Sequence, residues 1–293
     1  MSNSDNFKRI RDLPIWRGDT LIEPLTGGIT NLNFVVTDRA GKYVVRLGED
    51  ITAHHVMRFN ELAASHAAHA AGLSPAVIYA ERGITVLDFI ESRTLTPQDV
   101  CEPKYLEQIL PLIRRCHLDV ASNFRGPALI FWVFHVIRDY AATLTKDNSR
   151  HSALIPELLK INANLEAQAG PFEVVFGHND LLAGNFLDDG NKLWLIDWDY
   201  AGFNTPLFDL GGLASNNGLT ETQETWMLET YFETARTDGL WHRYQAMKCA
   251  SLLRETMWSM VSEIHSTLDF DYGSYTTENL ASFHAAYDNF IKS

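Results

Sequence analysis

The sequence predicts an α+β fold of two lobes: a small N-terminal antiparallel sheet plus one helix, then a larger, mainly helical C-terminal lobe. Short β-rich runs separated by turn residues dominate the first 90 residues, and one Ala-rich helical run interrupts them. Helical periodicity dominates the rest of the chain. At 293 residues the chain is long enough for two packed units, which we place at 1–90 and 91–293.

Five strands and one helix account for the first lobe. The predicted strands are short, rich in β-branched or aromatic residues, and bounded by turn residues. They span residues 20–25, 31–37, 42–48, 76–80 and 84–90. Residues 56–71 contain neither Pro nor Gly and are rich in Ala, so they predict a helix that ends before Gly72.

The composition is that of a globular protein with an acidic surface. Hydrophobic residues make up 46% of the chain, and 37 acidic against 24 basic side chains give a formal net charge of −13. This balance argues against a nucleic-acid partner, which needs a basic face to displace counterions. The three cysteines are far apart in sequence, and the first residues lack the apolar segment of a secretion signal. We therefore expect a cytoplasmic protein without membrane insertion.

A stretch of acids and amides, GHNDLLAGNFLDDGNKLWLIDWD, interrupts the helical part of the chain between Gly177 and Asp199. Short apolar runs frame it and predict three strands, of which the last two form a hairpin. They span residues 172–176, 185–187 and 192–196.

This hairpin predicts where three oxygen-bearing side chains meet. An antiparallel hairpin returns the chain to the end where it began, so Asp180, Asn185 and Asp197 should share one end. Such a group suits Mg²⁺, which binds one or two carboxylates or amides together with substrate phosphate oxygens. It also suits phosphoryl transfer, in which the protein mainly positions groups and neutralises charge. The sequence therefore predicts a site for a metal-bound phosphate and an attacking hydroxyl.

The spacing H-x-D-x-x-x-x-N followed by I-D-W-D resembles the catalytic segments of protein-kinase-like phosphotransferases. More narrowly, it is similar to the choline/ethanolamine kinase and aminoglycoside phosphotransferase group. The resemblance implies a protein-kinase-like fold with ATP and Mg²⁺ as cofactors. It makes Asp180 the base that orients and deprotonates the substrate hydroxyl, and Asn185 and Asp197 the metal ligands. It also makes His178 a support beneath the loop and Asp209 an acceptor of hydrogen bonds from the loop backbone.

The first lobe should supply the phosphate contacts. The backbone N–H groups of Gly27 and Gly28, between two strands, are candidates to face a phosphate. The segment resembles the short glycine loop of choline kinases, in which a Gly is followed closely by Ser or Thr and by Asn. The matching residues here are Gly28, Thr30 and Asn31.

Three more residues complete the expected nucleotide site. Arg46 stands where protein kinases carry their phosphate-binding lysine, and choline kinases resemble this chain in having Arg there. Arg remains charged and can contact two oxygens at once. The resemblance makes Glu61 its partner on the helix. Adenine is expected against the 88–90 segment between the lobes, which includes Phe89.

The last third of the chain resembles the segment of choline kinases in which an aromatic box surrounds a quaternary ammonium. By that likeness Trp258 and Tyr275 line the box, and Phe270 and Tyr272, which lie close in sequence, are candidates to pack behind it. A trimethylammonium group cannot donate hydrogen bonds, so a receptor uses ring faces, each contributing roughly 0.5–2 kcal/mol. We therefore expect an ATP-dependent phosphotransferase for a small amino alcohol, with choline as the preferred acceptor.

Two departures from the choline-kinase pattern leave the acceptor open to ethanolamine, thiamine or another small alcohol. Asn216 and Asn217 stand where a carboxylate is usual, and Glu255 stands where a second Trp is common. Two rival functions also remain: an aminoglycoside phosphotransferase and a non-catalytic pseudokinase that only binds. Pseudokinases typically lose a metal-binding or base residue, whereas this chain keeps all three.

Overall fold

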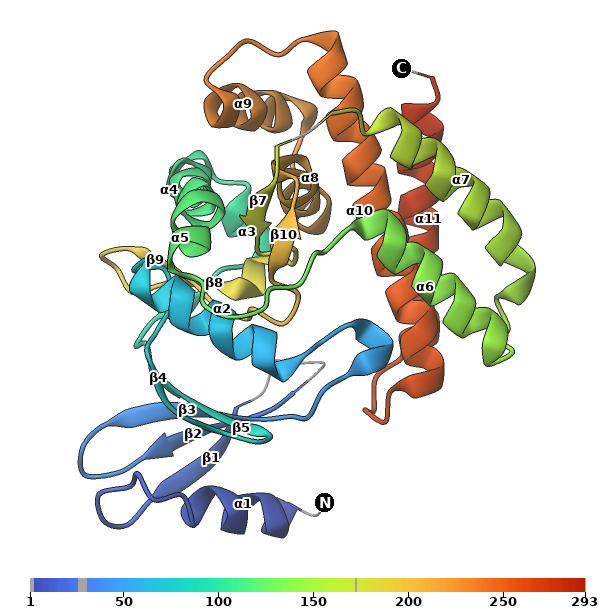
Figure 1. Cartoon of the computed structure of the whole chain (residues 1–293). Helices are drawn as coiled ribbons and strands as arrows, with labels where there is room; N and C mark the ends of the chain where they lie inside the picture. The colour runs from blue at the N-terminus through green and yellow to red at the C-terminus, as the bar shows by residue number, and fades with distance from the viewer. Residues whose placement is uncertain (1–2, 26–30, 172, 293) are drawn as a thin grey trace.

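The N-terminal part of the computed structural model is an antiparallel sheet with the strand order β1-β2-β3-β5-β4 (Figure 1). The structure describes residues 3–25, 31–171 and 173–292. The five strands are β1 Leu21–Leu25, β2 Leu32–Thr37, β3 Lys42–Leu47, β4 Val77–Glu81 and β5 Ile84–Asp88. The five strands predicted for this region are confirmed.

Two helices flank this sheet on opposite sides (Figure 1). The sequence did not indicate α1 (Asn3–Arg11), whose Ile10 is buried in the same core cluster as Phe34, Val45 and other sheet residues. The predicted helix is α2 (Arg58–Ala70), which lies between the sheet and the helical part of the molecule. Its buried alanines belong to the core of the helical part. The helix therefore joins the two layers rather than covering the sheet alone.

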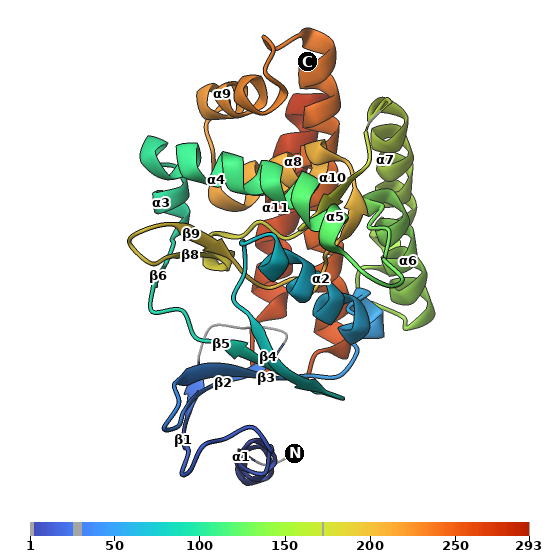
Figure 2. The ribbon, with the colours of Figure 1, turned by 60° about the vertical axis from the view of Figure 1, so that its left-hand side comes forward.

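The rest of the chain is mainly helical, as predicted. The helices are α3 Pro97–Val100, α4 Pro103–Arg115, α5 Ala121–Asn123, α6 Val133–Lys146, α7 Ile155–Gln168, α8 Pro206–Asn217, α9 Glu221–Phe232, α10 Asp238–His265 and α11 Tyr272–Phe290. The 28-residue α10 runs through the centre of this part and packs against α6, α7, α8 and α11 (Figure 2). Across the described residues, no helix combines the length and the apolar character that a membrane span requires.

Two small sheets belong to the described residues of 91–293. One has the order β6-β8-β9, formed by β6 Arg93–Thr94, β8 Phe186–Asp188 and β9 Leu193–Leu195. The other pairs β7 Val175–Gly177 with β10 Gly202–Asn204. The predicted β8–β9 hairpin is confirmed. Two further strands were not predicted: β6, which pairs with β8, and β10, which pairs with β7.

Helices α8 and α10 approach each other closely at Gly211. A Cβ atom at this position would lie 2.9 Å from the Cα of Lys248 on α10, closer than packed atoms tolerate. The absence of a side chain at Gly211 therefore fixes the distance between α8 and α10. Both helices carry residues of the site described below.

Candidate active site

The loop between β7 and β8 is held from below by Asp209 on α8. Its Oδ1 accepts a hydrogen bond from the Asn179 backbone N–H at 2.7 Å, and its Oδ2 accepts one from the His178 N–H at 2.8 Å. This confirms the predicted bracing of the loop backbone. Burial alone would raise the pKa of Asp209, but the hydrogen bond and charge of His117 hold it below the usual range. Asp209 is therefore an ionised acceptor.

His117 is a bracing residue that sequence reasoning missed. It lies in a single π-helical turn, Cys116–Val120, which follows α4. Its Nε2 contacts Asp209 Oδ2 at 2.9 Å and its Nδ1 contacts the Tyr231 hydroxyl at 2.7 Å. Such turns often occur at functional sites, but the sequence around His117 carries no signal for one.

The structure brings Asp180, Asn185 and Asp197 into one site. The Asn185 side-chain amide donates to the Asp180 carbonyl at 2.8 Å, and the Asn185 carbonyl accepts from the Ile196 N–H at 3.0 Å. His178, fully buried, contacts the Ile196 carbonyl through Nε2 at 2.9 Å, which places it beneath the loop as expected. The hairpin argument for their proximity is sound, while the base and metal-binding roles of these residues stay predictions.

The Asp180 carboxylate is partly buried and has no hydrogen-bond partner in the described part of the chain. Burial raises the pKa of Asp180 to about 8; the Arg254 charge opposes this shift, and Glu255 and Asp197 add to it. A carboxyl group with a raised pKa is a stronger proton acceptor than an ordinary aspartate once it is ionised. Its environment therefore suits a general base.

Asp197 has the properties of a cation ligand. Its side chain is 32% exposed, and its Oδ1 accepts from Arg46 Nη2 at 2.7 Å. Burial alone would raise its pKa, but the Arg46 guanidinium holds the pKa of Asp197 below the usual value. No set of three or more His, Cys, Asp or Glu side chains in the described ranges has metal-binding geometry. The predicted ligands, one carboxylate and one amide completed by phosphate oxygens, are the sparse protein set that Mg²⁺ commonly accepts.

Arg46 of β3 lies at the centre of an ion-pair cluster. Its Nη1 contacts Glu61 Oε1 at 2.8 Å, which confirms Glu61 of α2 as its partner. Its Nη2 contacts Asp199 Oδ1 at 3.1 Å in addition to Asp197. The side chain is only 11% exposed, so these contacts operate where solvent screens charge weakly. Arg46 is therefore an interior cation, and its role as a phosphate ligand stays a prediction.

A second arginine, Arg58, extends this cluster and was missed by the sequence reasoning. Its Nη1 donates to Glu61 Oε2 at 2.6 Å and to Asp199 Oδ1 at 2.9 Å. Its Nη2 donates to Asn31 Oδ1 at 2.6 Å, while Asn31 Nδ2 donates to Asp199 Oδ2 at 3.1 Å. Asn31 is thus hydrogen-bonded to Asp199, the second acid of the I-D-W-D motif. That motif was the feature of the sequence from which Asp199 could have been identified as a site residue.

The remaining expected nucleotide residues have different outcomes. Gly27, Gly28 and Thr30 lie outside the described residues. Phe89 follows β5 directly, where the Lys42 ammonium lies 3.9 Å from its ring centroid. The Phe89 backbone N–H donates to the Lys42 carbonyl at 3.2 Å. That N–H is already used by the sheet, so a contact between Phe89 and adenine would involve its ring or its carbonyl group.

The predicted aromatic residues of the acceptor site also lie together. The ring centroids of Trp258 and Tyr275 are 6.4 Å apart, and Phe270 and Tyr272 lie beside them as expected. Trp258 is only 4% exposed, and its Nε1 donates to the Tyr200 hydroxyl at 2.8 Å. The Trp258 ring therefore has a fixed orientation. Its contact with substrate stays a prediction.

Two charged residues of α10 adjoin these rings. Glu255 Oε1 accepts from the Tyr275 hydroxyl at 2.8 Å, and Glu255 Oε2 accepts from Arg254 Nη1 at 2.9 Å. Arg254 also lies over the Tyr200 ring, 4.2 Å from its centroid. From the sequence, Glu255 was expected to add attraction for the ammonium as a nearby acid, and it was also noted as a departure from the choline-kinase pattern. Arg254 and Tyr200 were missed.

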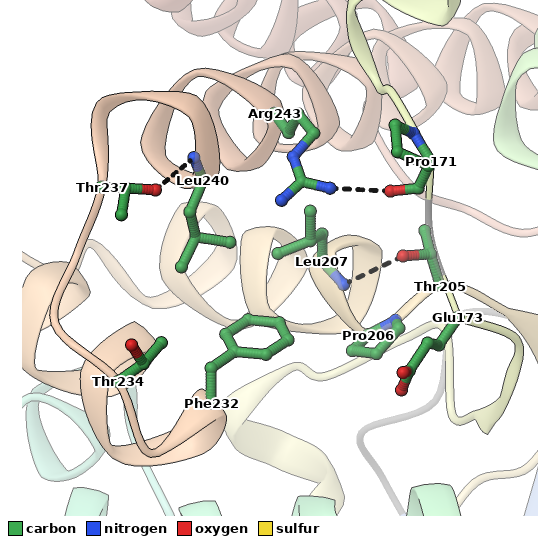
Figure 3. Close-up of a pocket in the computed structure, with 10 residues that line it drawn as sticks. All are labelled: Pro171, Glu173, Thr205, Pro206, Leu207, Phe232, Thr234, Thr237, Leu240 and Arg243. Carbon is green, nitrogen blue, oxygen red and sulfur yellow. Dashed lines mark hydrogen bonds between the residues drawn. The ribbon is translucent and has the colours of Figure 1, made fainter.

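The structure also contains a cavity of about 530 Å³ that is separate from this site (Figure 3). It lies between the start of α8, the end of α9 and the start of α10, and Leu207, Phe232 and Arg243 are among the residues around it. Glu173 is the one acidic residue in its lining, so it lacks the convergent carboxylates of phosphoryl-transfer sites. The candidate active site is therefore the Asp180 loop and not this cavity.

Comparisons with known proteins agree with this fold. A relative from Arabidopsis thaliana, named probable ethanolamine kinase, is 30% identical over 287 residues, which cover 87% of this chain and 76% of that protein. The crystal structure of a choline/ethanolamine kinase family protein from Mesorhizobium loti has a TM-score of 0.79 at 26% identity, over 98% of this chain and 95% of that one. LicA in complex with AMP has a TM-score of 0.74 at 20% identity, over 98% and 100% of the two chains.

The model of the choline/ethanolamine kinase family matches residues 22–231, which is more than half of the chain. The matched region begins in β1 and ends in α9, so it includes the Arg46 cluster and the Asp180 loop. The chain therefore belongs to the choline/ethanolamine kinase family, whose members phosphorylate an alcohol group.

Proposed function

We propose that this protein transfers the γ-phosphate of Mg²⁺-bound ATP to the hydroxyl of a small amino alcohol. The observation that carries the proposal is the placement of Asp180, Asn185 and Asp197 on one loop and hairpin, opposite Arg46. Phosphoryl transfer requires this combination of a base, oxygen ligands for a cation, and a positive charge near the phosphates.

Each residue has a distinct role in the proposed reaction. Asn185 and Asp197 hold Mg²⁺, which neutralises charge on the phosphates when bound. Arg46, oriented by Glu61, contacts phosphate oxygens. Asp180 accepts a hydrogen bond from the acceptor hydroxyl and takes its proton as the oxygen attacks phosphorus. The structure of LicA with AMP supports an adenine nucleotide as the donor.

We place the nucleotide between the two units of the chain, 1–90 and 91–293, with adenine against the 88–90 segment. The contacts of Arg46 with Asp197 and of Asn31 with Asp199 cross this boundary and support it as the site of the phosphates.

The three free, scattered cysteines support a reducing compartment, and we propose the cytoplasm.

Choline is the first acceptor that we propose. The rings of Trp258 and Tyr275, with Phe270 beside them, offer faces and edges to a quaternary ammonium. Once Asp180 is ionised, Asp180 and Glu255 carry two negative charges, and Arg254 offsets one of them. The remaining single charge suits an acceptor with one ammonium group better than an aminoglycoside with several.

Ethanolamine is the second candidate, and Glu255 is the observation that favours it. Each Glu255 oxygen already accepts one hydrogen bond, and a carboxylate oxygen can accept two. A primary ammonium can donate to the free positions, whereas a trimethylammonium cannot. The Arabidopsis relative, named as an ethanolamine kinase, points in the same direction.

Initial-rate measurements with purified protein test the proposal. We expect ATP-dependent phosphorylation of choline or ethanolamine that stops when a chelator removes divalent cations and returns with added Mg²⁺. Thiamine and kanamycin serve as acceptors from other classes. Faster turnover of kanamycin than of the amino alcohols would identify an antibiotic-modifying enzyme. The absence of phosphorylation with every acceptor would identify a pseudokinase.

A further inference from the structure

Arg254 is a buried cation at the proposed acceptor site. It is 4% exposed, and its guanidinium lies 4.2 Å from the Tyr200 ring centroid and 5.8 Å from that of Phe131. Its Nη1 donates to Glu255 Oε2. The Arg254 charge is also the first opposing influence on the raised pKa of Asp180, which places it close to the proposed base.

This arrangement is unfavourable for stability. The Arg254 Nε and Nη2 atoms are buried without a well-aligned hydrogen-bond acceptor among the described residues, although the Tyr140 hydroxyl lies near the guanidinium. Removing such N–H groups from water without replacing their hydrogen bonds destabilises the folded state, and more so for a charged group. A buried ion pair of this kind is often no more stable than apolar side chains of similar volume. Stability alone therefore does not explain an arginine at this position.

Two contact routes connect Arg254 to the two predicted box residues. The first runs through the Tyr200 ring, whose hydroxyl accepts from Trp258 Nε1 at 2.8 Å. The second runs through Glu255, whose other oxygen accepts from the Tyr275 hydroxyl at 2.8 Å. One guanidinium thus touches the partner of each box residue.

We propose that Arg254 is a positioning residue for the acceptor site: it fixes Tyr200 and Glu255, and through them Trp258 and Tyr275, around the amino alcohol. The inference rests on the proposed function, because it assigns the setting of that same site. Arginine suits the task because its plane stacks on a ring while its N–H groups bond a carboxylate at the edge. Lysine has a compact ammonium and cannot do both in the same way.

Three variants test this role. Arg254→Met keeps the apolar length of the side chain but removes the charge and the donors. Arg254→Lys keeps the charge without the plane. Lys248→Met is the matched control, because Lys248 lies on the same helix and its Nζ pairs with the buried Glu224 of α9, away from the aromatic residues. Steady-state kinetics with choline and with ethanolamine, and Tm, are measured for each variant.

We expect Arg254→Met to raise the KM of the amino alcohol about tenfold or more, with the KM of ATP changed less than about twofold. Arg254→Lys should fall between this variant and the original protein. The Tm of Arg254→Met should stay near the original value, because a costly buried group is lost and Glu255, which is 21% exposed, keeps its hydrogen bond from Tyr275. Lys248→Met should lower Tm, since it leaves the buried Glu224 without its cation partner, without raising the acceptor KM.

The possible failures are distinguishable. If the original protein phosphorylates an amino alcohol and Arg254→Met keeps its acceptor KM, the positioning role is wrong and the function stands. A large fall in Tm with equal rises in both KM values would assign Arg254 a general structural role and also overturn the inference. If the original protein phosphorylates no amino alcohol, the proposed function fails and the inference fails with it.

Discussion

Arg46 of β3 and Asp197, two residues beyond β9, form an ion pair with 2.7 Å between Nη2 and Oδ1. This contact joins the large sheet to the segment that follows the β8–β9 hairpin, across 151 positions of the sequence. The pair sets the predicted phosphate ligand beside the predicted metal ligand. Opposite charges so placed hold each other ionised, which phosphate binding and metal binding both require.

Replacing Arg46 should weaken nucleotide binding selectively. We expect Arg46→Met to raise the KM of ATP about tenfold or more, because a buried cation next to the phosphates is lost. The KM of the amino alcohol should change little. Arg82→Met is the control, since the Arg82 side chain is 93% exposed on the same part of the chain. Equal ATP KM values in both variants would contradict the phosphate role.

Replacing Asp180 should reduce the chemical step. Loss of a general base typically costs about 10²–10⁴ in rate, so Asp180→Ala should lower kcat by that range while ATP affinity stays close to normal. The measurement is kcat at saturating ATP and amino alcohol, together with ATP binding by calorimetry. Asp288→Asn, an exposed acid on α11, serves as the control. A near-normal kcat in Asp180→Ala would remove Asp180 from the role of base.

The β8–β9 hairpin could be predicted because its apolar runs and turn residues lie close together in the sequence. Strand pairing requires that Asp180, Asn185 and Asp197 share one end, and the structure agrees. The five strands of the large sheet were predictable for the same reason, since each is several residues long with clear turn residues between them.

The arginines could not be predicted because their roles depend on contacts between distant segments. Arg58 lies on α2 like many solvated helix arginines, and only the fold brings Asp199 to it from 141 positions away. Arg254 stands between Leu253 and Glu255 in the sequence, and a charged residue next to another charged residue usually lies at the surface, so the sequence does not indicate that it is 4% exposed. The strands β6 and β10, of two and three residues, are too short for any periodic signal.

Glu255 should decide between the two proposed acceptors. We expect Glu255→Gln to raise the KM of ethanolamine more than that of choline, because only a primary ammonium donates hydrogen bonds to the carboxylate. The measurement is the ratio of kcat/KM for the two acceptors in each protein. Glu263→Gln is the control. Glu263 lies about two turns further along α10, and its carboxylate pairs with Arg150 instead. An unchanged ratio in Glu255→Gln would contradict the specificity role.

His54 should make the protein less stable in mild acid. Burial, aided by the Arg254 charge, lowers the pKa of His54 to about 3. In the unfolded chain a His has a pKa of about 6.5 and takes up a proton below that pH, so unfolding is favoured as pH falls from 6.5 towards 3. Between pH 7 and pH 5 this residue should reduce the free energy of unfolding by about 2 kcal/mol.

Chemical denaturation at the two pH values measures that difference. In His54→Gln the loss of unfolding free energy between pH 7 and pH 5 should be smaller by about 2 kcal/mol, because Gln does not titrate. His66→Gln, which changes an exposed His of α2, should behave like the original protein. The same pH dependence in all three proteins would show that His54 is not a buried neutral group.

The close approach at Gly211 ties recognition to chemistry. Helix α8 supplies Asp209 to the loop that carries Asp180, and α10 supplies Arg254 to the acceptor side. One added methyl group at residue 211 would press on the Lys248 backbone and wedge these two supports apart. Gly211→Ala should therefore disturb turnover number and acceptor affinity in tandem, although residue 211 is buried between two helices. If only one of these two quantities changed in Gly211→Ala, the supports from α8 and α10 would be independent of each other.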